Sequence, residues 1–67
     1  MLPLLPFERL AKKAGIKRIA TDALEELRDV IEERGLVLAE HAVRLTHHAN
    51  RRTVAGSDIE FAARRRF

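Results

Sequence analysis

The chain has no cysteine, no tryptophan and no tyrosine, and only three of its 67 residues are phenylalanine. The absence of cysteine excludes disulfide bonds and thiolate metal ligands. Three phenylalanines are too few for the rows of stacked aromatic side chains that typically bind single-stranded nucleic acid. A domain of this size buries only about 60% of the surface that its unfolded chain exposes. We therefore expect its stability to depend on a partner chain, or on a metal held by histidine and carboxylate.

Long hydrophobic runs are also absent. No stretch approaches the roughly 20 apolar residues of a membrane span. The leucines at positions 2, 4 and 5 are interrupted by the two prolines of the chain, and no basic residue precedes them. This start does not have the pattern of a signal peptide, so we expect a cytoplasmic protein without a membrane partner.

The residue types that carry chemistry in enzymes are not arranged for catalysis. The sequence has no Ser-His-Asp or Cys-His set and no glycine-rich phosphate-binding loop, so we expect neither an enzyme nor a cofactor. His41 and His48 share one face of a helix, but they lie about 10.5 Å apart along its axis. This distance is too long for one metal ion and His47 points elsewhere, so we expect no metal site.

Charge is distributed unevenly along the chain, although the net charge is only +3. Residues 1–21 carry five basic side chains and one acidic side chain, and residues 41–67 carry six basic and two acidic ones. Residues 22–40 between them carry seven acidic and two basic side chains. Basic ends with an acidic middle indicate a protein that contacts phosphate at selected points rather than over its whole surface.

Apolar residues recur with the 3.6-residue period of a helix and predict three helices, at residues 4–14, 22–49 and 57–66. We therefore expect a single all-α domain over residues 1–67, without tails. The first helix has an apolar stripe on one side and basic residues on another. Gly15 ends this helix, as glycine commonly does. The apolar residues are Phe7, Leu10, Ala11 and Ala14, and the basic residues are Arg9, Lys12 and Lys13.

The starts of the second and third helices carry capping patterns. Thr21 is the predicted N-cap of the second helix, and acidic residues follow it where the helix dipole favours anions. Ser57 and Glu60 have the spacing of a capping box at the start of the third helix. Glu60 is also expected to pair with Arg64 one turn later.

The long central helix is the feature that predicts a dimer. It is about 42 Å long at 1.5 Å per residue, whereas a compact globule of this chain length is only about 28 Å across. Two flanking helices of about ten residues cannot cover its broad apolar stripe. Gly35 is its weakest point, and a break there into two shorter helices stays an alternative. We expect an obligate dimer in which the long helices of two copies cross, so that folding depends on protein concentration.

Residues at both ends of the chain carry a resemblance to a known family. The front has Leu2-Pro3, Pro6, Arg9, Lys12, Ala14-Gly15 and Arg18-Ile19, and the back has His48-Ala49, Arg51-Arg52-Thr53-Val54, Asp58-Ile59-Glu60, Ala62 and Arg64-Arg65. In this order and at these separations, they resemble the archaeal histones over nearly the whole chain. The resemblance implies the histone fold, with two chains interlocked head to tail in a handshake dimer. It also implies binding, bending and wrapping of double-stranded DNA without reading of its sequence.

The resemblance further assigns contacts with DNA. Arg9 and Arg18 correspond to arginines that enter the minor groove, and Arg18 is held there by Thr53 of the paired loop. Arg52 and Lys12 correspond to phosphate contacts. Head-to-tail pairing brings the loop that carries Lys17 and Arg18 beside the partner's loop at residues 50–53. The expected DNA-binding residues are Arg9, Lys12, Lys13, Lys17, Arg18, Arg52 and Thr53.

Two further roles follow from the same resemblance. Arg51 and Asp58 correspond to a structural ion pair that fixes the second loop against the last helix. Leu45, His48 and Asp58 correspond to residues at which two dimers join, so the dimers can assemble further on DNA in the nucleoid. Asn50 departs from the family pattern because it stands where glycine is usual, but asparagine also tolerates a left-handed backbone.

One alternative stays open beside DNA packaging. The chain could be a histone-fold subunit of a transcription-factor-like heterodimer, which would predict a missing loop cation or a preference for a second partner. Retention of Arg9, Arg18, Arg52 and Thr53 favours DNA packaging, and mixed dimers with paralogues are left open. A helix-turn-helix regulator fits less well, because its helices are short and one of them must read bases.

Overall fold

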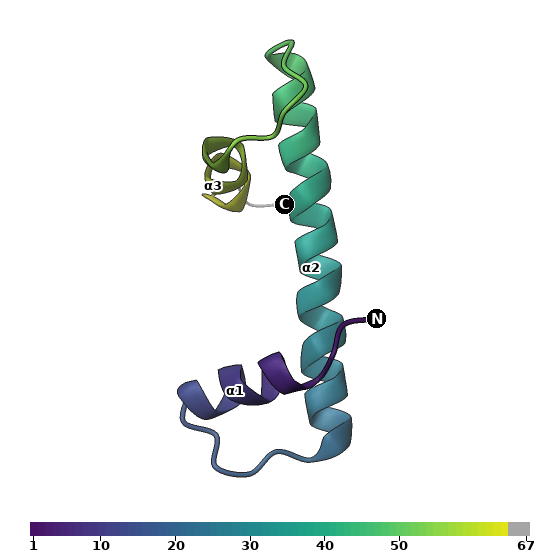
Figure 1. The fold of residues 1–67 in the computed structure, drawn as a ribbon, viewed down its shortest axis with the longest axis vertical. Coiled ribbons are helices and arrows are strands. Elements are labelled where there is room, and N and C mark those ends of the chain that lie inside the picture. Colours follow the sequence, from purple (N-terminus) through teal and green to yellow (C-terminus); the bar gives the residue numbers. More distant parts are fainter. Residues whose placement is uncertain (65–67) are drawn as a thin grey trace. The chain divides into compact units, whose positions relative to one another are not determined.

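The computed structural model describes residues 1–64, and these form three helices without a strand. Helix α1 spans Leu5–Lys13, α2 spans Thr21–His48 and α3 spans Gly56–Arg64 (Figure 1). The predicted order of a short, a long and a short helix is confirmed, and every boundary except the end of α3 lies within two residues of its predicted position. The predictions for the last turn of the third helix and for its arginines at positions 65 and 66 lie outside the described residues.

Helix α2 continues through Gly35, so the alternative of a break at that residue is wrong. A Cβ added at Gly35 would meet no atom of this chain within 4 Å, so no close approach within the chain uses this glycine. The chain's contacts fall into two compact units, Met1–Glu33 and Arg34–Phe67. The expected single domain stays a prediction.

The first unit consists of α1 and the beginning of α2. Its buried apolar residues are Phe7 and Ala11 of α1 and Leu24 of α2. Helix α1 ends in a Schellman motif, in which the Ile16 N–H donates to the Ala11 carbonyl at 3.0 Å and Gly15 has a φ of 97°. The predicted end of the helix at Gly15 is therefore confirmed, and the positive φ is the physical reason why glycine stands there.

The second unit consists of the end of α2 and α3. Ala42 of α2 and Ala62 of α3 are fully buried, and such small side chains let two helices pack closely. Helix α2 ends as α1 does: the Arg51 N–H donates to the Thr46 carbonyl at 3.0 Å, and Asn50 adopts a φ of 58°. The expectation that Asn50 supports a left-handed backbone in place of glycine is confirmed.

The predicted helix starts are displaced by one or two residues. Ala20 is the cap of α2, because its carbonyl accepts the first helical hydrogen bond from the Leu24 N–H at 3.0 Å. The predicted capping box of Ser57 and Glu60 is wrong, since α3 already begins at Gly56. Instead, the Ala55 N–H donates to the Asp58 carboxylate at 2.8 Å, which is the side-chain half of a capping box. The predicted pair of Glu60 with Arg64 is present at 2.7 Å.

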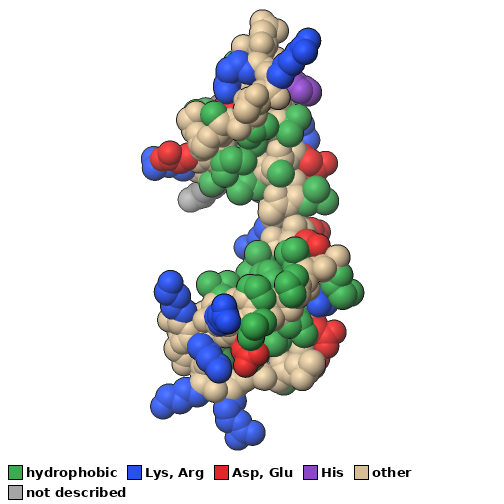
Figure 2. All heavy atoms as spheres, viewed as in Figure 1, with side chains coloured by type: hydrophobic (Ala, Val, Ile, Leu, Met, Phe, Trp, Pro, Cys, Tyr) green, Lys and Arg blue, Asp and Glu red, His purple; other side chains and the backbone are tan. Residues whose placement is uncertain are grey.

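Apolar surface is left uncovered in both units. Among the described residues only five apolar side chains are buried, and three of these are alanines. Large apolar side chains remain exposed on all three helices and on the segments beside them, and many of them are visible as green patches in Figure 2. They include Leu5, Leu10, Leu36, Val37, Val43, Ile59 and Phe61. A single copy thus leaves uncovered the kind of surface that a partner chain buries.

No helix within residues 1–64 combines the length and the apolar character that a membrane crossing needs.

Substitution of Asn50 tests the left-handed end of α2. We expect Asn50→Ala to lower the free energy of unfolding by about 1 kcal/mol, because a Cβ without a local hydrogen-bonding group is unfavourable at positive φ. Asn50→Gly is expected to leave the stability unchanged or to raise it. Urea unfolding at one fixed protein concentration measures both variants. Equal stability of the alanine and glycine variants would contradict the assigned backbone conformation.

Candidate nucleic-acid interface

The first group of cationic side chains lies on α1. Phe7 and Ala11 face the interior of the first unit, so Arg9 and Lys13 lie on the opposite, exposed side of the helix. Lys12 is exposed as well, and its Nζ lies 3.7 Å from a carboxylate oxygen of Glu8 one turn earlier. Figure 2 shows Lys and Arg side chains gathered around this unit. The solvent-facing side of α1 is therefore the basic side, as the spacing predicted.

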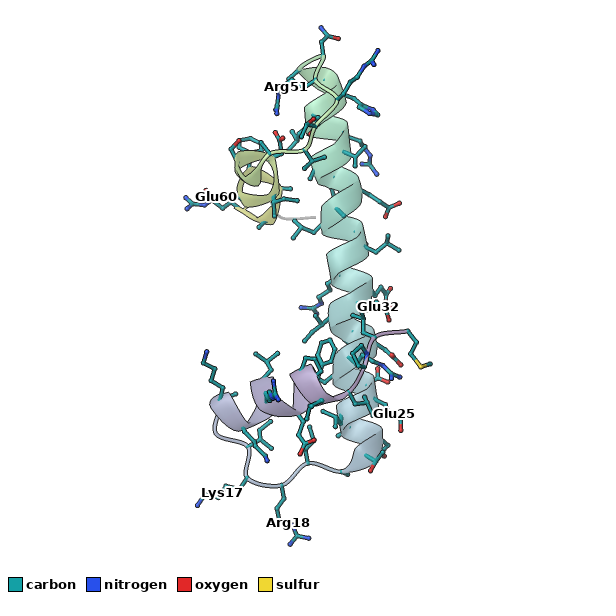
Figure 3. The ribbon with its side chains drawn as sticks, viewed as in Figure 1. Lys17, Arg18, Glu25, Glu32, Arg51 and Glu60 are labelled. Atoms are coloured by element: carbon teal, nitrogen blue, oxygen red, sulfur yellow. The ribbon has the colours of Figure 1, made fainter. Side chains whose placement is uncertain are left out.

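The segment between α1 and α2 extends this basic surface. Lys17 and Arg18 are both exposed there, and Figure 3 shows them pointing away from the helices. Ile19 and Ala20 separate them from the N-terminus of α2, where the helix dipole favours anions. One N–H of this first turn is already occupied, because the Ala23 N–H donates to the Asp22 carboxylate at 2.8 Å. The segment thus offers two long cationic side chains to a phosphate.

The second group of cations lies on the segment between α2 and α3. Arg51, Arg52 and Thr53 are all exposed at the residue level, but the two arginines differ in what they contact. The guanidinium of Arg51 binds the Asp58 carboxylate through two hydrogen bonds, of 2.6 and 3.0 Å. No such ion pair holds Arg52 within the described part of the chain. Arg52 is therefore the cation that this segment presents to an outside anion.

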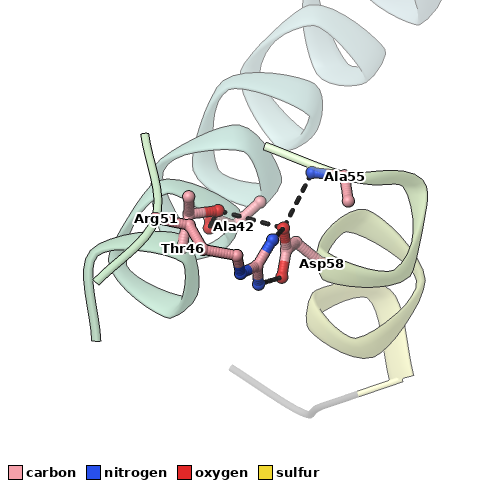
Figure 4. Close-up of polar contacts among 5 residues, drawn as sticks. All are labelled: Ala42, Thr46, Arg51, Ala55 and Asp58. Carbon is pink, nitrogen blue, oxygen red and sulfur yellow. Dashed lines mark hydrogen bonds and ion pairs between the residues drawn. The ribbon is translucent and has the colours of Figure 1, made fainter. Parts of the chain in front are cut away.

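Asp58 is the centre of the polar contacts that hold this segment on α3 (Figure 4). It is 6% exposed, and its Oδ2 accepts hydrogen bonds from Arg51, from the Ala55 N–H and from the Thr46 hydroxyl at 3.1 Å. The Thr46 Oγ1 also lies 2.9 Å from the Ala42 carbonyl, so its proton is shared between two acceptors. A buried carboxylate is stable only when it is paired and hydrogen-bonded in this way.

These contacts favour the charged forms of both partners. The hydrogen bond from Arg51, followed by the one from the Ala55 N–H, holds the pKa of the Asp58 carboxyl well below its ordinary value of 3.8. The smaller effect of desolvation opposes them. The hydrogen bond and the charge of Asp58 in turn raise the pKa of Arg51. The pair therefore remains ionised at any pH near neutrality.

The structure brings together only some of the expected site residues. Arg51 and Asp58 form the ion pair that the resemblance assigned to them. Arg18 belongs to the first unit and Thr53 to the second, and their contact, which the resemblance places between two chains, stays a prediction. The same holds for the minor-groove and phosphate roles of the cations.

The residues expected between two dimers lie at the end of α2 and in α3. His48, the last residue of α2, is exposed, and Leu45 is half-buried. Asp58 is already engaged, and only its Oδ1, which accepts a single hydrogen bond, has acceptor capacity left for a second dimer. The dimer–dimer contact stays a prediction. Among residues 1–64 no group of three histidine, cysteine or carboxylate side chains could hold a metal ion.

Two polar residues that the sequence analysis did not single out are buried. Thr46 is 1% exposed and completes the contacts of Asp58. Arg28 is 6% exposed in the first unit. Both lie four residues after a buried apolar residue, Ala42 and Leu24 respectively. A polar residue at this spacing on an apolar stripe is the signal that could have identified them.

Comparison with known proteins places the chain in a family. Residues 1–63 match the family described as "Histone-like transcription factor (CBF/NF-Y) and archaeal histone". The chain is also 35% identical over 63 residues to one of the subunits of the archaeal histone HAN1 from Thermococcus zilligii, and the match covers 94% of each chain.

The depressed pKa of Asp58 predicts a pH-dependent stability. The folded state holds the carboxyl proton less tightly than the unfolded state, so the stabilisation is present above the unfolded pKa of 3.8 and is lost as pH falls below it. We expect Asp58→Asn to be less stable than the unsubstituted protein near neutral pH, with a deficit that shrinks as the medium becomes acidic. Urea unfolding across this pH range, at one protein concentration, measures the deficit.

Glu60→Gln is the matched control, because it removes the carboxylate of the exposed pair with Arg64. Such a surface pair contributes little to stability, so this variant should follow the unsubstituted protein at every pH. A deficit of Asp58→Asn that stays constant from neutral to acidic pH would contradict the assignment.

Proposed function

Since the chain belongs to the family of archaeal histones and histone-like transcription factors, we propose that it packages double-stranded DNA by binding, bending and wrapping it without reading its sequence. Membership already makes it a histone-fold DNA-binding protein. The proposal adds the mode of binding and the residues that carry it. Members of the family act as structural proteins on DNA, and the proposal includes no enzymatic step.

The observation that carries the proposal is the placement of the exposed cations. They concentrate on the outer side of α1, on the segment after it and on the segment between α2 and α3. The first half of α2 instead carries six acidic residues, from Asp22 to Glu33. A polyanion is therefore attracted to these basic parts of the chain and repelled by the acidic part of α2, which favours a few phosphate contacts over uniform coating.

In the proposed mechanism the cations neutralise phosphates and release counterions, so the affinity falls steeply with salt. Arg9 and Arg18 enter the minor groove where it faces the protein, as arginines do in histone assemblies that make no base-specific contacts. Arg52 and Lys12 contact phosphates, and Lys13 and Lys17 add further positive charge to the DNA-binding surface. Selectivity comes from the ease with which a sequence bends, because the DNA must curve to reach successive contacts.

A second copy of the chain is part of the proposed function. The exposed apolar side chains of both units support an obligate dimer in which two α2 helices cross. In a head-to-tail dimer Arg18 of one chain lies beside Thr53 of its partner, and each end of the dimer presents both basic segments. The ion pair of Arg51 with Asp58 supports this role, because it fixes the segment that carries Arg52 and Thr53.

We further propose that dimers assemble on DNA in the nucleoid. Leu45 and His48 lie near the end of α2 and are accessible to a second dimer. His48 of one dimer would approach the remaining acceptor position of Asp58 in the next. Wrapping would then extend by addition of dimers along the duplex.

A second candidate function is supported by the comparisons. The matching family includes histone-like transcription factors as well as archaeal histones, and the HAN1 relative is described as a subunit. A protein that works as half of a heterodimer would need another chain to become stable or to bind DNA. Purified protein that is dimeric alone and shifts DNA of mixed sequence would favour packaging, and a need for a second chain would favour the alternative.

Arginine substitutions test the packaging mechanism. We expect Arg18→Ala and Arg52→Ala each to weaken binding to a duplex of mixed sequence by about tenfold, since each removes a contact with the DNA backbone or groove. Each should also reduce the salt dependence by about one phosphate contact. Fluorescence titrations at several salt concentrations measure both quantities.

Arg34→Ala is the control, because it removes the same charge from an exposed position on α2. It should change the affinity by less than about twofold. Equal losses for all three variants would show that only net charge matters and would contradict the assigned contacts.

A further inference from the structure

Arg28 is a buried cation that has no part in the contacts with DNA described above. It lies on the first half of α2 and is 6% exposed. Its Nε donates a hydrogen bond of 3.0 Å to the carboxylate of Asp29. Its Nη1 donates one of 3.3 Å to the backbone carbonyl of Leu2, which precedes it by 26 residues. The side chain therefore connects α2 to the segment that leads into α1.

An arginine at this position is not explained by packing alone. The buried apolar residues of the same unit are Phe7, Ala11 and Leu24, and an apolar side chain of similar length at position 28 would be buried without loss of hydration. Its acidic partner Asp29 is more than half exposed, so that ion pair is screened by solvent. What an apolar residue could not supply is the directed hydrogen bond to the Leu2 carbonyl.

Helix α1 needs an external contact at its start. It has only nine residues, and its cap residue Leu4 makes no side-chain hydrogen bond to the first turn. Isolated helices of this length are not stable in water. The Phe7 and Glu8 N–H groups both bond to the Leu4 carbonyl at 3.0 Å, so the first turn depends on where the chain before it is held. Arg28 holds that chain two residues upstream of Leu4.

We propose that Arg28 is a positioning residue for DNA binding, which fixes the start of α1 and thereby the direction of Arg9 on its outer side. This inference rests on the proposed function, because it assigns to Arg28 the support of a residue that contacts DNA. Arg28 acts through α1 and does not itself contact DNA. The cationic side of α1 is then presented at a fixed angle rather than over a range of angles.

The test combines two substitutions with two measurements. Arg28→Met keeps the length and apolar stem of the side chain but removes the donors, and Arg28→Lys keeps the charge with a different donor geometry. Arg34→Met is the matched control, since it removes the same charge from an exposed position of the same helix. Amide hydrogen exchange in the free protein reports the local opening of α1, and duplex titrations report the affinity.

We expect faster exchange of the Phe7 and Glu8 amides in Arg28→Met, with the amides of α3 unchanged. The affinity for duplex DNA should fall about fivefold, and this loss should disappear in an Arg9→Ala background, because Arg28 then has no contact left to position. The exchange rates and the affinity of Arg28→Lys should lie between those of Arg28→Met and those of the unsubstituted protein. Arg34→Met should resemble the unsubstituted protein in both measurements. If Arg28→Met does not fold, the same measurements of amide exchange and of affinity, with and without Arg9, can be made on Arg28→Lys.

Unchanged exchange at Phe7 and Glu8, or an affinity loss that persists without Arg9, would overturn the positioning role while leaving the proposed function intact. Unsubstituted protein that does not bind duplex DNA would contradict the proposed function itself. The exchange measurement on the free protein separates these two failures, because it does not depend on DNA.

Discussion

The constraint on which the rest of this molecule depends is the small amount of apolar surface that one chain can cover. Helices α1 and α3 bury few side chains against α2, and several of those are alanines. Hydrophobic burial is the main favourable contribution to folding. The chain has no cysteine for a disulfide, and within residues 1–64 no group of three ligand-type side chains could hold a metal ion. The proposed second copy would cover the exposed leucines, valines and Phe61 and would thereby supply the missing stability. Binding of DNA by paired loops would then follow from the same association.

Polar contacts have a different task from the apolar ones. Asp58 and Arg51, together with Thr46 and the Ala55 N–H, form a hydrogen-bonded set with no buried side-chain polar atom left unpaired in the described residues. Such a set adds directionality rather than much net stability. It sets the path of the segment that presents Arg52 outward. In the first unit, Arg28 makes an equally directional contact with the chain before α1. In both units a hydrogen-bonded arginine, the buried Arg28 in the first and the exposed Arg51 in the second, supports a part of the chain whose other cations remain exposed.

Sequence periodicity predicted the three helices and their order because the 3.6-residue pattern is continuous and interrupted only at Gly15 and around Asn50. Both residues adopt the left-handed backbone that ends a helix. The capping pattern of α3 was predicted wrongly, since Ala55 with Asp58 and Ser57 with Glu60 both have capping spacing, and the choice between them depends on the tertiary contact of Asp58 with Arg51. Thr46 and Arg28 were missed for the same reason: their partners lie 12 and 26 residues away in the sequence. A contact between Arg18 and Thr53 would join two chains, so it cannot be seen within one.

The most direct test of this account is a dilution series from about 100 μM to about 10 nM, followed by sedimentation velocity and circular dichroism on the same samples. If association supplies the apolar burial that one copy lacks, the helical signal will be lost as the dimer dissociates, and the thermal midpoint will rise with protein concentration. A monomer that keeps its full helical signal at micromolar concentration would contradict the account.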